Sequence, residues 1–411
     1  MKKYFLFFIL SLFALYAKAQ SSYTLEDYFN YFQQAGDKCQ QLHKEGKYQE
    51  EEEIFISNLK KLEEVSLTEE DPKRQKKLIE ALKANIYYNL ACVRSLQNKK
   101  KEAIEALEKA IAFGYNDYRH TKTDEDFINI RKEKKFLVLL EKLRPFDKLV
   151  ILQQAGGYQK QQTDTLPRFT YQSAKDPSLE HVRNYFKLDS VAGKGDELSK
   201  IFNLLRFVHN NIAHDGGNYA LCEFDAIDIY NYHKATKKGV NCRHLAITLN
   251  EMYLAMGIPS RYVTCMPKDP DDMDCHVINS VYSQQLQKWI WIDPTNNAYV
   301  KDENGNLLSI AEMRDRLIHN KPLVLNEDAN WNNQKKQTKE EYLESYMAKN
   351  LYWFSCPLQS RFNPESRFRK TDTSYVALLP EGFTIQKGIE EYITNDPDYF
   401  WQKPVMMTND K

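Results

Sequence analysis

Three side chains between positions 242 and 293 carry the functional groups of a thiol-based acyl-transfer site. They are Cys242, His276 and Asp293, in that chain order. In such a site a thiolate attacks a carbonyl carbon, an imidazole moves the proton, and a carboxylate holds the imidazole in the correct tautomer. The sequence therefore predicts a catalytic triad if the fold brings these three residues together.

Cys242 is predicted to be the first residue of a helix. Gly257 and Pro259 end a run in which apolar residues recur at the spacing of a buried helix face, namely Leu245, Ala246, Leu249, Met252, Tyr253 and Met256. The N–H groups and the dipole at a helix N-terminus favour a thiolate and stabilise an oxyanion on a substrate carbonyl. Gly239 permits a sharp backbone turn into this position.

Residues 276–293 are predicted to form a β-hairpin. Val277, Ile278, Val281 and Tyr282 favour a strand, residues 283–287 form a polar turn, and residues 289–292 favour a second strand. The two ends of a hairpin lie close together. His276 begins one strand and Asp293 follows the other, so the carboxylate is placed to orient the imidazole while the other ring nitrogen faces the thiol.

These segments resemble the transglutaminase-like domain, a branch of the papain-like cysteine enzymes. The resemblance covers roughly residues 185–300 and rests on four motifs that occur in the family's order. They are the Gly-x-x-Cys helix start at 239–242, the Gly-Ile-Pro-x-Arg turn at 257–261, the strand that begins with His276, and the Trp-x-x-x-Asp-Pro-Thr strand at 289–295. It implies an α+β fold in which a helix that bears the cysteine packs on an antiparallel sheet. It also implies roles for Cys242 as nucleophile, His276 as general base and Asp293 as orienting acid.

The family's additional oxyanion-hole side chain, which lies upstream of the cysteine, has no evident counterpart in this sequence. Members of the family include transglutaminases, proteases, peptide N-glycanases and domains without activity. The resemblance therefore implies the chemistry more closely than it implies the substrate.

The segments around the nucleophile supply candidates for the substrate cleft, which are Tyr219, Phe224, Asn241, Arg243 and Trp291. Residues 216–238 are a loop-rich approach to Cys242, although aromatic residues in such loops more often pack than contact a substrate. His209, His214, His233 and His244 do not have the spacing of a metal site. We expect no metal and no cofactor.

The N-terminus has the pattern of a secretory signal peptide. Two lysines precede an apolar run over residues 4–16, and Ala17-Lys18-Ala19 predicts cleavage between Ala19 and Gln20. The expected location is therefore periplasmic, secreted or cell-surface. The run is too short to span a bilayer, and no later segment has the ~20 apolar residues that a span needs.

The charge balance disfavours a nucleic-acid partner. Removing Lys2, Lys3 and Lys18 with the signal peptide leaves 54 basic residues against 57 acidic ones, a formal net charge of −3. The seven cysteines are an odd number, so at least one is expected to be unpaired in an exported protein. Cys265 and Cys275 flank a short loop, and the sequence is compatible both with a disulfide and with two buried thiols.

Residues 24–143 have the pattern of successive helices. The segment 87–114 resembles a tetratricopeptide repeat, and an earlier helix pair over 25–44 and 48–65 lies 52 residues upstream rather than the usual 34, so the repeat is degenerate. Asp71 and Pro72 are the expected cap and first residue of the third helix. Such a module acts either as a binding groove for a protein partner or as a brace for the enzyme domain, and we favour the brace.

The sequence predicts five regions: a signal peptide (1–19), a helical domain that resembles tetratricopeptide repeats (20–143), a linker (144–178), a transglutaminase-like domain (179–325) and an aromatic-rich C-terminal extension (326–411). The extension is expected to pack on the core, because exposing its apolar surface would be costly. Whether it covers the cleft or a sheet edge stays open.

The leading functional hypothesis is an exported cysteine enzyme that acts on amide or peptide bonds of a protein or peptide. The alternative is a non-catalytic binding or scaffold protein that uses the helices. The complete set of three triad residues favours the enzyme. Hydrolysis is favoured over crosslinking because water is abundant and no acidic cluster suggests a calcium-regulated crosslinker.

Overall fold

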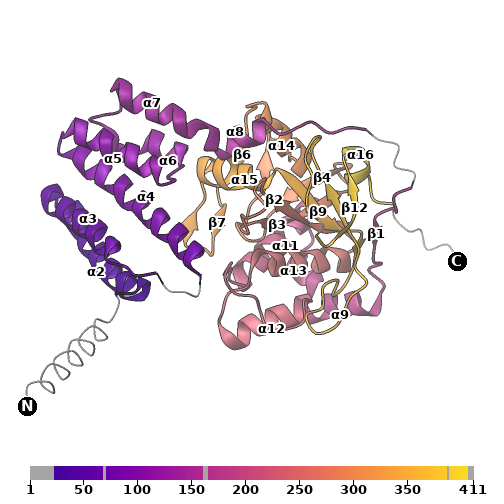
Figure 1. Cartoon of the computed structure of the whole chain (residues 1–411). Coiled ribbons are helices and arrows are strands. Elements are labelled where there is room, and N and C mark those ends of the chain that lie inside the picture. The colour runs from indigo at the N-terminus through magenta and orange to yellow at the C-terminus, as the bar shows by residue number, and fades with distance from the viewer. Residues whose placement is uncertain (1–22, 68–70, 161–164, 387, 406–411) are drawn as a thin grey trace, which may run out of the picture. The chain divides into compact units, whose positions relative to one another are not determined.

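The computed structural model describes residues 23–67, 71–160, 165–386 and 388–405. The chain divides into two compact units, one up to Asp147 and one from Lys148 onward (Figure 1). The predicted signal peptide lies outside the described residues. Within the described part of the chain, no helix is long and apolar enough to cross a membrane.

The N-terminal unit consists of helices joined by short turns. Its elements are α2 (Leu25–Lys44), α3 (Tyr48–Glu63), α4 (Pro72–Leu96), α5 (Lys100–Ala112), α6 (Tyr118–Thr123), η1 (Glu125–Phe127), α7 (Lys134–Leu143) and η2 (Arg144–Phe146). Asp71 caps α4 as predicted, because its carboxylate accepts a 3.0 Å hydrogen bond from the Arg74 N–H. Ala91, Ala103 and Ala110 are fully buried, so α4 and α5 pack closely through small side chains.

The C-terminal unit is built on a six-stranded sheet. The strands are β2 (Ser260–Met266), β3 (His276–Ser283), β4 (Lys288–Ile292), β9 (Trp353–Pro357), β11 (Tyr375–Leu378) and β12 (Glu390–Thr394), in the order β12-β11-β9-β2-β3-β4. All neighbours are antiparallel except β11 and β12, which are parallel. The predicted hairpin over residues 276–293 is confirmed as β3 and β4, with Ser280 opposite Trp291.

Helices cover both faces of this sheet, so alternate residues of each strand enter two different cores. Tyr262 joins the core on one face and Val263 the core on the other. The first core includes α9 (Pro177–Phe186), α10 (Leu188–Ala192), α11 (Glu197–Asn211), α12 (Ala226–Thr236) and α13 (Cys242–Ala255). The second includes α8 (Lys148–Gln153), α14 (Ile310–Ile318), the π-helix η3 (Lys339–Met347), α15 (Ala348–Asn350) and α16 (Pro397–Phe400). The result is the α+β architecture that the sequence predicts.

Short two-stranded ladders complete the unit. They are β1 (Thr170–Tyr171) with β10 (Gln359–Ser360), β5 (Val300–Lys301) with β6 (Val324–Leu325), and β7 (Asn330–Trp331) with β8 (Lys335–Lys336). The ladder of β7 and β8 positions Trp331, which takes part in the site described below.

Helix α13 lies in the centre of the first core and contacts both β2 and β3. Every residue from His244 to Ala255 is buried. The buried Glu251 carboxylate accepts 2.8 Å hydrogen bonds from the backbone N–H groups of Ala226 and Asn363, and burial raises its pKa well above the ordinary value. The helix that begins with Cys242 is therefore fixed along its whole length.

The C-terminal segment differs from the predicted extension over 326–411. Strand β9 pairs with the central strand β2, and β11 and β12 extend the sheet beyond it, so the segment supplies half of the sheet rather than packing on it. Strands β9 and β11 are short and buried on both faces, which leaves little polar–apolar alternation to mark them, whereas the edge strand β12 is partly exposed. A domain boundary at residue 325 is not present in the structure.

The predicted linker over 144–178 also differs from the structure in the parts that are described. It contains α8 and β1, and both Leu152 and Phe169 are buried in the second core. The guanidinium of Arg261, which is fully buried, lies 4.3 Å from the centre of the Phe169 ring. The apolar residues of this segment are therefore core residues rather than parts of a connector.

Candidate active site

Cys242 is the first residue of α13, as predicted. Asn241 is the helix N-cap, and its side-chain oxygen accepts a 3.1 Å hydrogen bond from the His244 N–H. Burial opposes ionisation of the Cys242 thiol, but hydrogen bonds from His214 and His276, together with the charge of His276, lower its pKa to about 6. Cys242 is therefore mainly a thiolate at neutral pH.

His276 and Asp293 form a buried pair. The hairpin brings the His276 Nε2 atom to 2.8 Å from Asp293 Oδ2, and both side chains are at most 1 % exposed. Burial disfavours the imidazolium, but the charge of Asp293 outweighs it and raises the pKa of His276 well above its ordinary value. Because Nε2 faces the carboxylate, Nδ1 is the ring nitrogen available to the Cys242 thiol.

The Asp293 carboxylate receives hydrogen bonds from several directions. Oδ1 accepts the backbone N–H groups of Thr295 at 2.8 Å and Asn296 at 3.3 Å, because the chain turns tightly after the strand. Oδ2 accepts the Asn296 side-chain amide at 3.0 Å and the Tyr342 hydroxyl at 2.5 Å, in addition to His276. Burial alone would raise the pKa of Asp293, but His276 and these donors lower it to about 2. The carboxylate is thus ionised and fixed in orientation.

His214 also forms a hydrogen bond with the Cys242 thiol. A parallel β-bridge joins His214 to Val240, two residues before Cys242, and the Trp331 indole N–H donates a 2.9 Å hydrogen bond to His214 Nδ1. A neutral imidazole that accepts at Nδ1 carries its proton on Nε2. The group directed at Cys242 is therefore an N–H donor.

Gly239 has a different role from the sharp turn that the sequence suggests. A Cβ atom at this position would lie 2.7 Å from Asp215 Cβ and 2.8 Å from the carbonyl carbon of His214. Glycine is therefore required because two backbone segments approach each other closely. This close approach is what places His214 beside Cys242.

Sequence reasoning missed His214, Trp331 and Tyr342. The sequence assigns no role to His214 beyond excluding it from a metal site, and Trp331 and Tyr342 lie in the segment predicted to be an extension. No local spacing identifies His214, since its position depends on the bridge to Val240. Gly239, the glycine that this close approach requires, is the residue whose type could have pointed to a segment packed beside Cys242.

The predicted cleft residues have different environments. Arg243 forms a 2.8 Å ion pair with Glu365 and donates to Thr264 Oγ1 at 3.0 Å, so its charge is already paired. The Trp291 side chain is fully buried in the second core and lines no cleft.

The two loop aromatics both pack against His244 on the first turn of α13. Phe224 is buried, whereas Tyr219 is 56 % exposed and is the aromatic candidate available to a substrate. The His244 imidazole is buried, which lowers its pKa to about 4, so it is neutral at physiological pH.

All seven cysteines are free thiols, so the disulfide considered between Cys265 and Cys275 is not formed. Burial raises the pKa of the six cysteines other than Cys242, to about 11 for Cys39 and Cys356 and to about 12 for Cys222. Cys242 differs from the others because two histidines donate hydrogen bonds to its sulfur.

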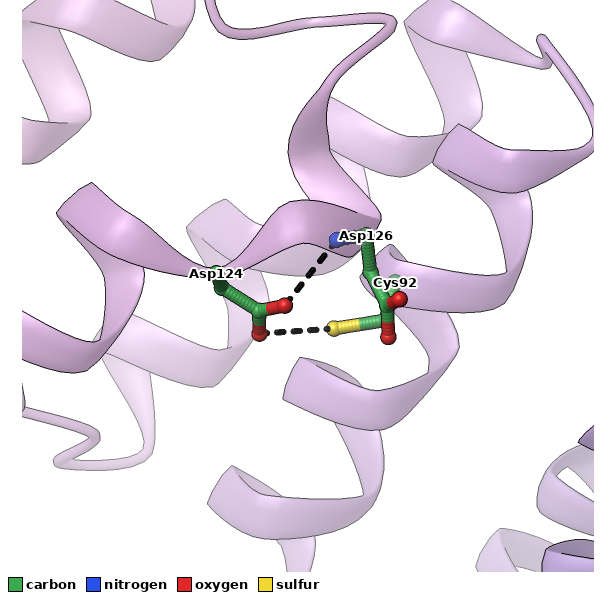
Figure 2. Close-up of side chains that lie close together, drawn as sticks. All are labelled: Cys92, Asp124 and Asp126. Carbon is green, nitrogen blue, oxygen red and sulfur yellow. Dashed lines mark hydrogen bonds between the residues drawn. The ribbon is translucent and has the colours of Figure 1, made fainter.

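The helical unit contains a group of possible metal ligands, Cys92, Asp124 and Asp126, whose ligand atoms lie within 4.8 Å of one another. Figure 2 shows the Cys92 thiol directed at the Asp124 carboxylate, with a sulfur–oxygen distance of 3.6 Å. The same carboxylate accepts the Tyr88 hydroxyl at 2.6 Å and the Asp126 N–H at 3.0 Å. Burial raises the pKa of the Cys92 thiol, so hydrogen bonds from neutral donors account for this cluster.

Comparisons with known proteins give one family and a few distant neighbours. Residues 185–294 match the model of the transglutaminase-like superfamily. A curated chloroplast protein of Arabidopsis thaliana is 39% identical over 54 residues, which are 13% of this chain and 16% of that protein.

Two solved structures also align with the chain. A candidate cysteine protease from Cytophaga hutchinsonii aligns with 17% identity and a TM-score of 0.24, over 46% of this chain and 65% of that one. A candidate protease from Parabacteroides distasonis aligns with 16% identity and a TM-score of 0.19, over 32% and 30%. The chain thus covers less than two thirds of each of these proteins. The family match includes Cys242, His276 and Asp293, and the chain therefore carries a transglutaminase-like superfamily domain at residues 185–294.

Proposed function

We propose that the chain is an exported cysteine enzyme that acts on amide or peptide bonds of a protein or peptide through an acyl-enzyme at Cys242. The observation that carries the proposal is that two imidazoles with different partners form hydrogen bonds with the Cys242 thiol. His276 is paired with Asp293 and holds a proton for the leaving group. His214 accepts from Trp331 and presents an N–H donor.

In the first half of the reaction, the Cys242 thiolate attacks the carbonyl carbon and the carbonyl π electrons move to oxygen. The His214 Nε2–H and the N–H groups at the start of α13 stabilise this oxyanion. When the carbonyl re-forms, the C–N bond breaks and His276 gives its Nδ1 proton to the departing amine. The products of this half are a thioester at Cys242 and a neutral imidazole.

In the second half, the neutral His276 removes a proton from the incoming nucleophile, which attacks the thioester carbonyl. Collapse of the second tetrahedral intermediate expels the Cys242 thiolate and leaves His276 protonated, as at the start. Water gives a carboxylic acid, whereas a primary amine gives a new amide. We propose hydrolysis as the main outcome, because water is present at far higher concentration than any amine.

The test is a mass-spectrometric screen of a mixed peptide pool after incubation with the purified protein. We expect cleaved or deamidated peptides with the wild type and none with Cys242→Ala. Cys222→Ala is the matched control, because it removes a half-buried thiol whose pKa is raised to about 12. Amine adducts as the main products would overturn the preference for hydrolysis, and no product of any kind would favour the scaffold alternative.

Export is part of the proposal and rests on the leader pattern of residues 1–19. N-terminal sequencing of the protein recovered from an extracytoplasmic fraction should begin at Gln20. A protein that stays in the cytoplasm and keeps residues 2–19 would contradict export, but it would leave the proposed chemistry unaffected.

A further inference from the structure

The π-helix η3 lies against two members of the triad, although it is outside the residues that match the family model. The hydroxyl of Tyr342, which is 2 % exposed, donates to Asp293 Oδ2 at 2.5 Å. One turn later, the Tyr346 ring contacts the His276 imidazole edge-on, with 5.3 Å between the ring centres. The two tyrosines therefore contact the carboxylate and the imidazole separately.

Both ends of η3 are fastened next to the same two triad residues. Before the helix, the Gln337 side-chain amide donates to the Asn296 side-chain oxygen at 2.9 Å, and Asn296 itself donates to Asp293. After the helix, Lys349 donates to the Asp274 carbonyl oxygen at 2.6 Å, two residues before His276. π-helices are rare and occur frequently at functional sites, and the position of this one is fixed relative to the triad.

The triad carboxylate needs a donor beyond His276 for a physical reason. The backbone N–H groups of Thr295 and Asn296 hold Oδ1, and an Oδ2 atom with fewer donors would take up a proton more easily. Tyr342 occupies Oδ2 from one side and Asn296 from another, so the oxygen that orients His276 is held in place. Each of these donors also withdraws negative charge from the oxygen that the imidazolium contacts.

We propose that Tyr342 is a positioning residue of the active site, a fourth member that acts on the thiol through Asp293 and His276. The ring of Tyr346 shields the imidazole of His276 from water. This inference rests on the proposed function. Through Tyr342, the C-terminal third of the chain would then affect the pKa of the proton that His276 transfers.

The pH dependence of alkylation tests this role without a known substrate. The rate at which iodoacetamide alkylates a thiolate–imidazolium pair rises in two steps, first as the pair forms and again when the imidazolium loses its proton. In Tyr342→Phe the Asp293 carboxylate loses a hydrogen-bond donor, so its negative charge stabilises the His276 imidazolium more strongly. The imidazolium should therefore keep its proton to higher pH. We expect the upper step to move up by about 0.5 to 1 pH unit.

Tyr399→Phe is the matched control. The Tyr399 hydroxyl is also in a buried setting and donates to a carbonyl oxygen, that of Pro167, at 2.6 Å, but it lies away from the triad. Both variants lose one hydrogen bond and should melt somewhat below the wild type. We expect only Tyr342→Phe to move the upper step.

A double-mutant comparison separates positioning from packing. In an Asp293→Asn background the charged acceptor is absent, so adding Tyr342→Phe should produce no further shift of the upper step. A shift of equal size in both backgrounds would overturn the role through Asp293. Equal profiles for Tyr342→Phe, Tyr399→Phe and the wild type would also overturn this inference and leave the proposed function standing. A wild-type Cys242 that labels like an ordinary thiol would overturn both.

Discussion

Replacing His276 by alanine should abolish the unusual acidity of the Cys242 thiol. The wild-type pKa of about 6 exists in spite of burial, because two histidines donate hydrogen bonds to the sulfur and one of them is charged. The variant removes the charge and one of the hydrogen bonds, while burial and the His214 hydrogen bond remain. The thiol should then titrate near or above the ~8.5 of an unperturbed cysteine.

The size of the effect follows from the thiolate fraction. With a pKa of about 6, roughly 90% of the Cys242 thiol is ionised at pH 7, and with a pKa of about 8.5 only about 3% is ionised. The thiolate fraction at pH 7 should therefore fall roughly 30-fold, but the more basic thiolate is roughly 10-fold to 20-fold more nucleophilic, so the labelling rate at pH 7 should fall only about 2-fold to 3-fold. The clearer result is the midpoint of the labelling curve, which should move up by about 2.5 pH units. The underlying free-energy change is about 3 kcal/mol at 1.36 kcal/mol per pKa unit.

The assay is a series of iodoacetamide labelling rates from pH 5 to 10, read residue by residue through peptide mapping. The other six cysteines serve as internal standards, since burial raises the pKa of each of them. At pH 6.5 Cys242 should be the main labelled site in the wild type. Asp293→Ala should give a smaller shift than His276→Ala, and Asp293→Asn should keep part of the reactivity because an amide oxygen still accepts from the imidazole.

The reasoning fails if wild-type Cys242 labels no faster than a model thiol, or if His276→Ala leaves the pH series unchanged. Either result would mean that the histidine does not stabilise a thiolate in solution. The scaffold hypothesis would then replace the enzyme hypothesis.

Four further predictions follow from the same geometry. His214→Ala should raise the pKa of Cys242 by about one unit and slow formation of the acyl-enzyme by roughly 10² to 10³-fold. Unchanged burst kinetics in this variant would rule out a role for His214 in stabilising the oxyanion. Gly239→Ala should lower the melting temperature and weaken Cys242 labelling, because the added Cβ separates the two backbone segments. Glu251→Ala should cost about 2 to 5 kcal/mol in a denaturant titration, since it leaves two buried N–H groups without an acceptor. Asp293 has a folded pKa of about 2, below the unfolded ~3.9, so it contributes about 2.6 kcal/mol of stability above pH 4, and this contribution is lost as the pH falls toward 2. Acid titrations of the wild type and Asp293→Asn should differ in that window.

The sequence predicts much of the site because its local signals are strong. The apolar spacing after Cys242 predicts α13 within one residue at its end, and the strand formers on both sides of a polar turn predict the hairpin of His276 and Asp293. These elements carry their own periodicity, and their tertiary neighbours only reinforce it.

The residues that sequence reasoning missed are positioned by contacts between distant segments. His214 reaches the thiol through a bridge to Val240 and a hydrogen bond from Trp331, 117 positions away. The direction of Tyr342 toward Asp293 depends on the register of the π-helix. Strand β9 is buried on both faces, so it lacks the alternation that identifies an exposed strand.

The strand order has a consequence for how the protein is made. The centre of the sheet pairs β2 with β9, so a ribosome must release residues up to about 357 before β2 has both of its neighbours. Arg261 in β2 also donates to the Phe400 carbonyl oxygen at 2.7 Å, a contact across 139 positions. Pairings this distant in sequence form late, because the long intervening chain must close first. The environment that lowers the pKa of Cys242 should therefore not be assembled on incomplete chains, and a truncated translation product should carry Cys242 as an ordinary cysteine.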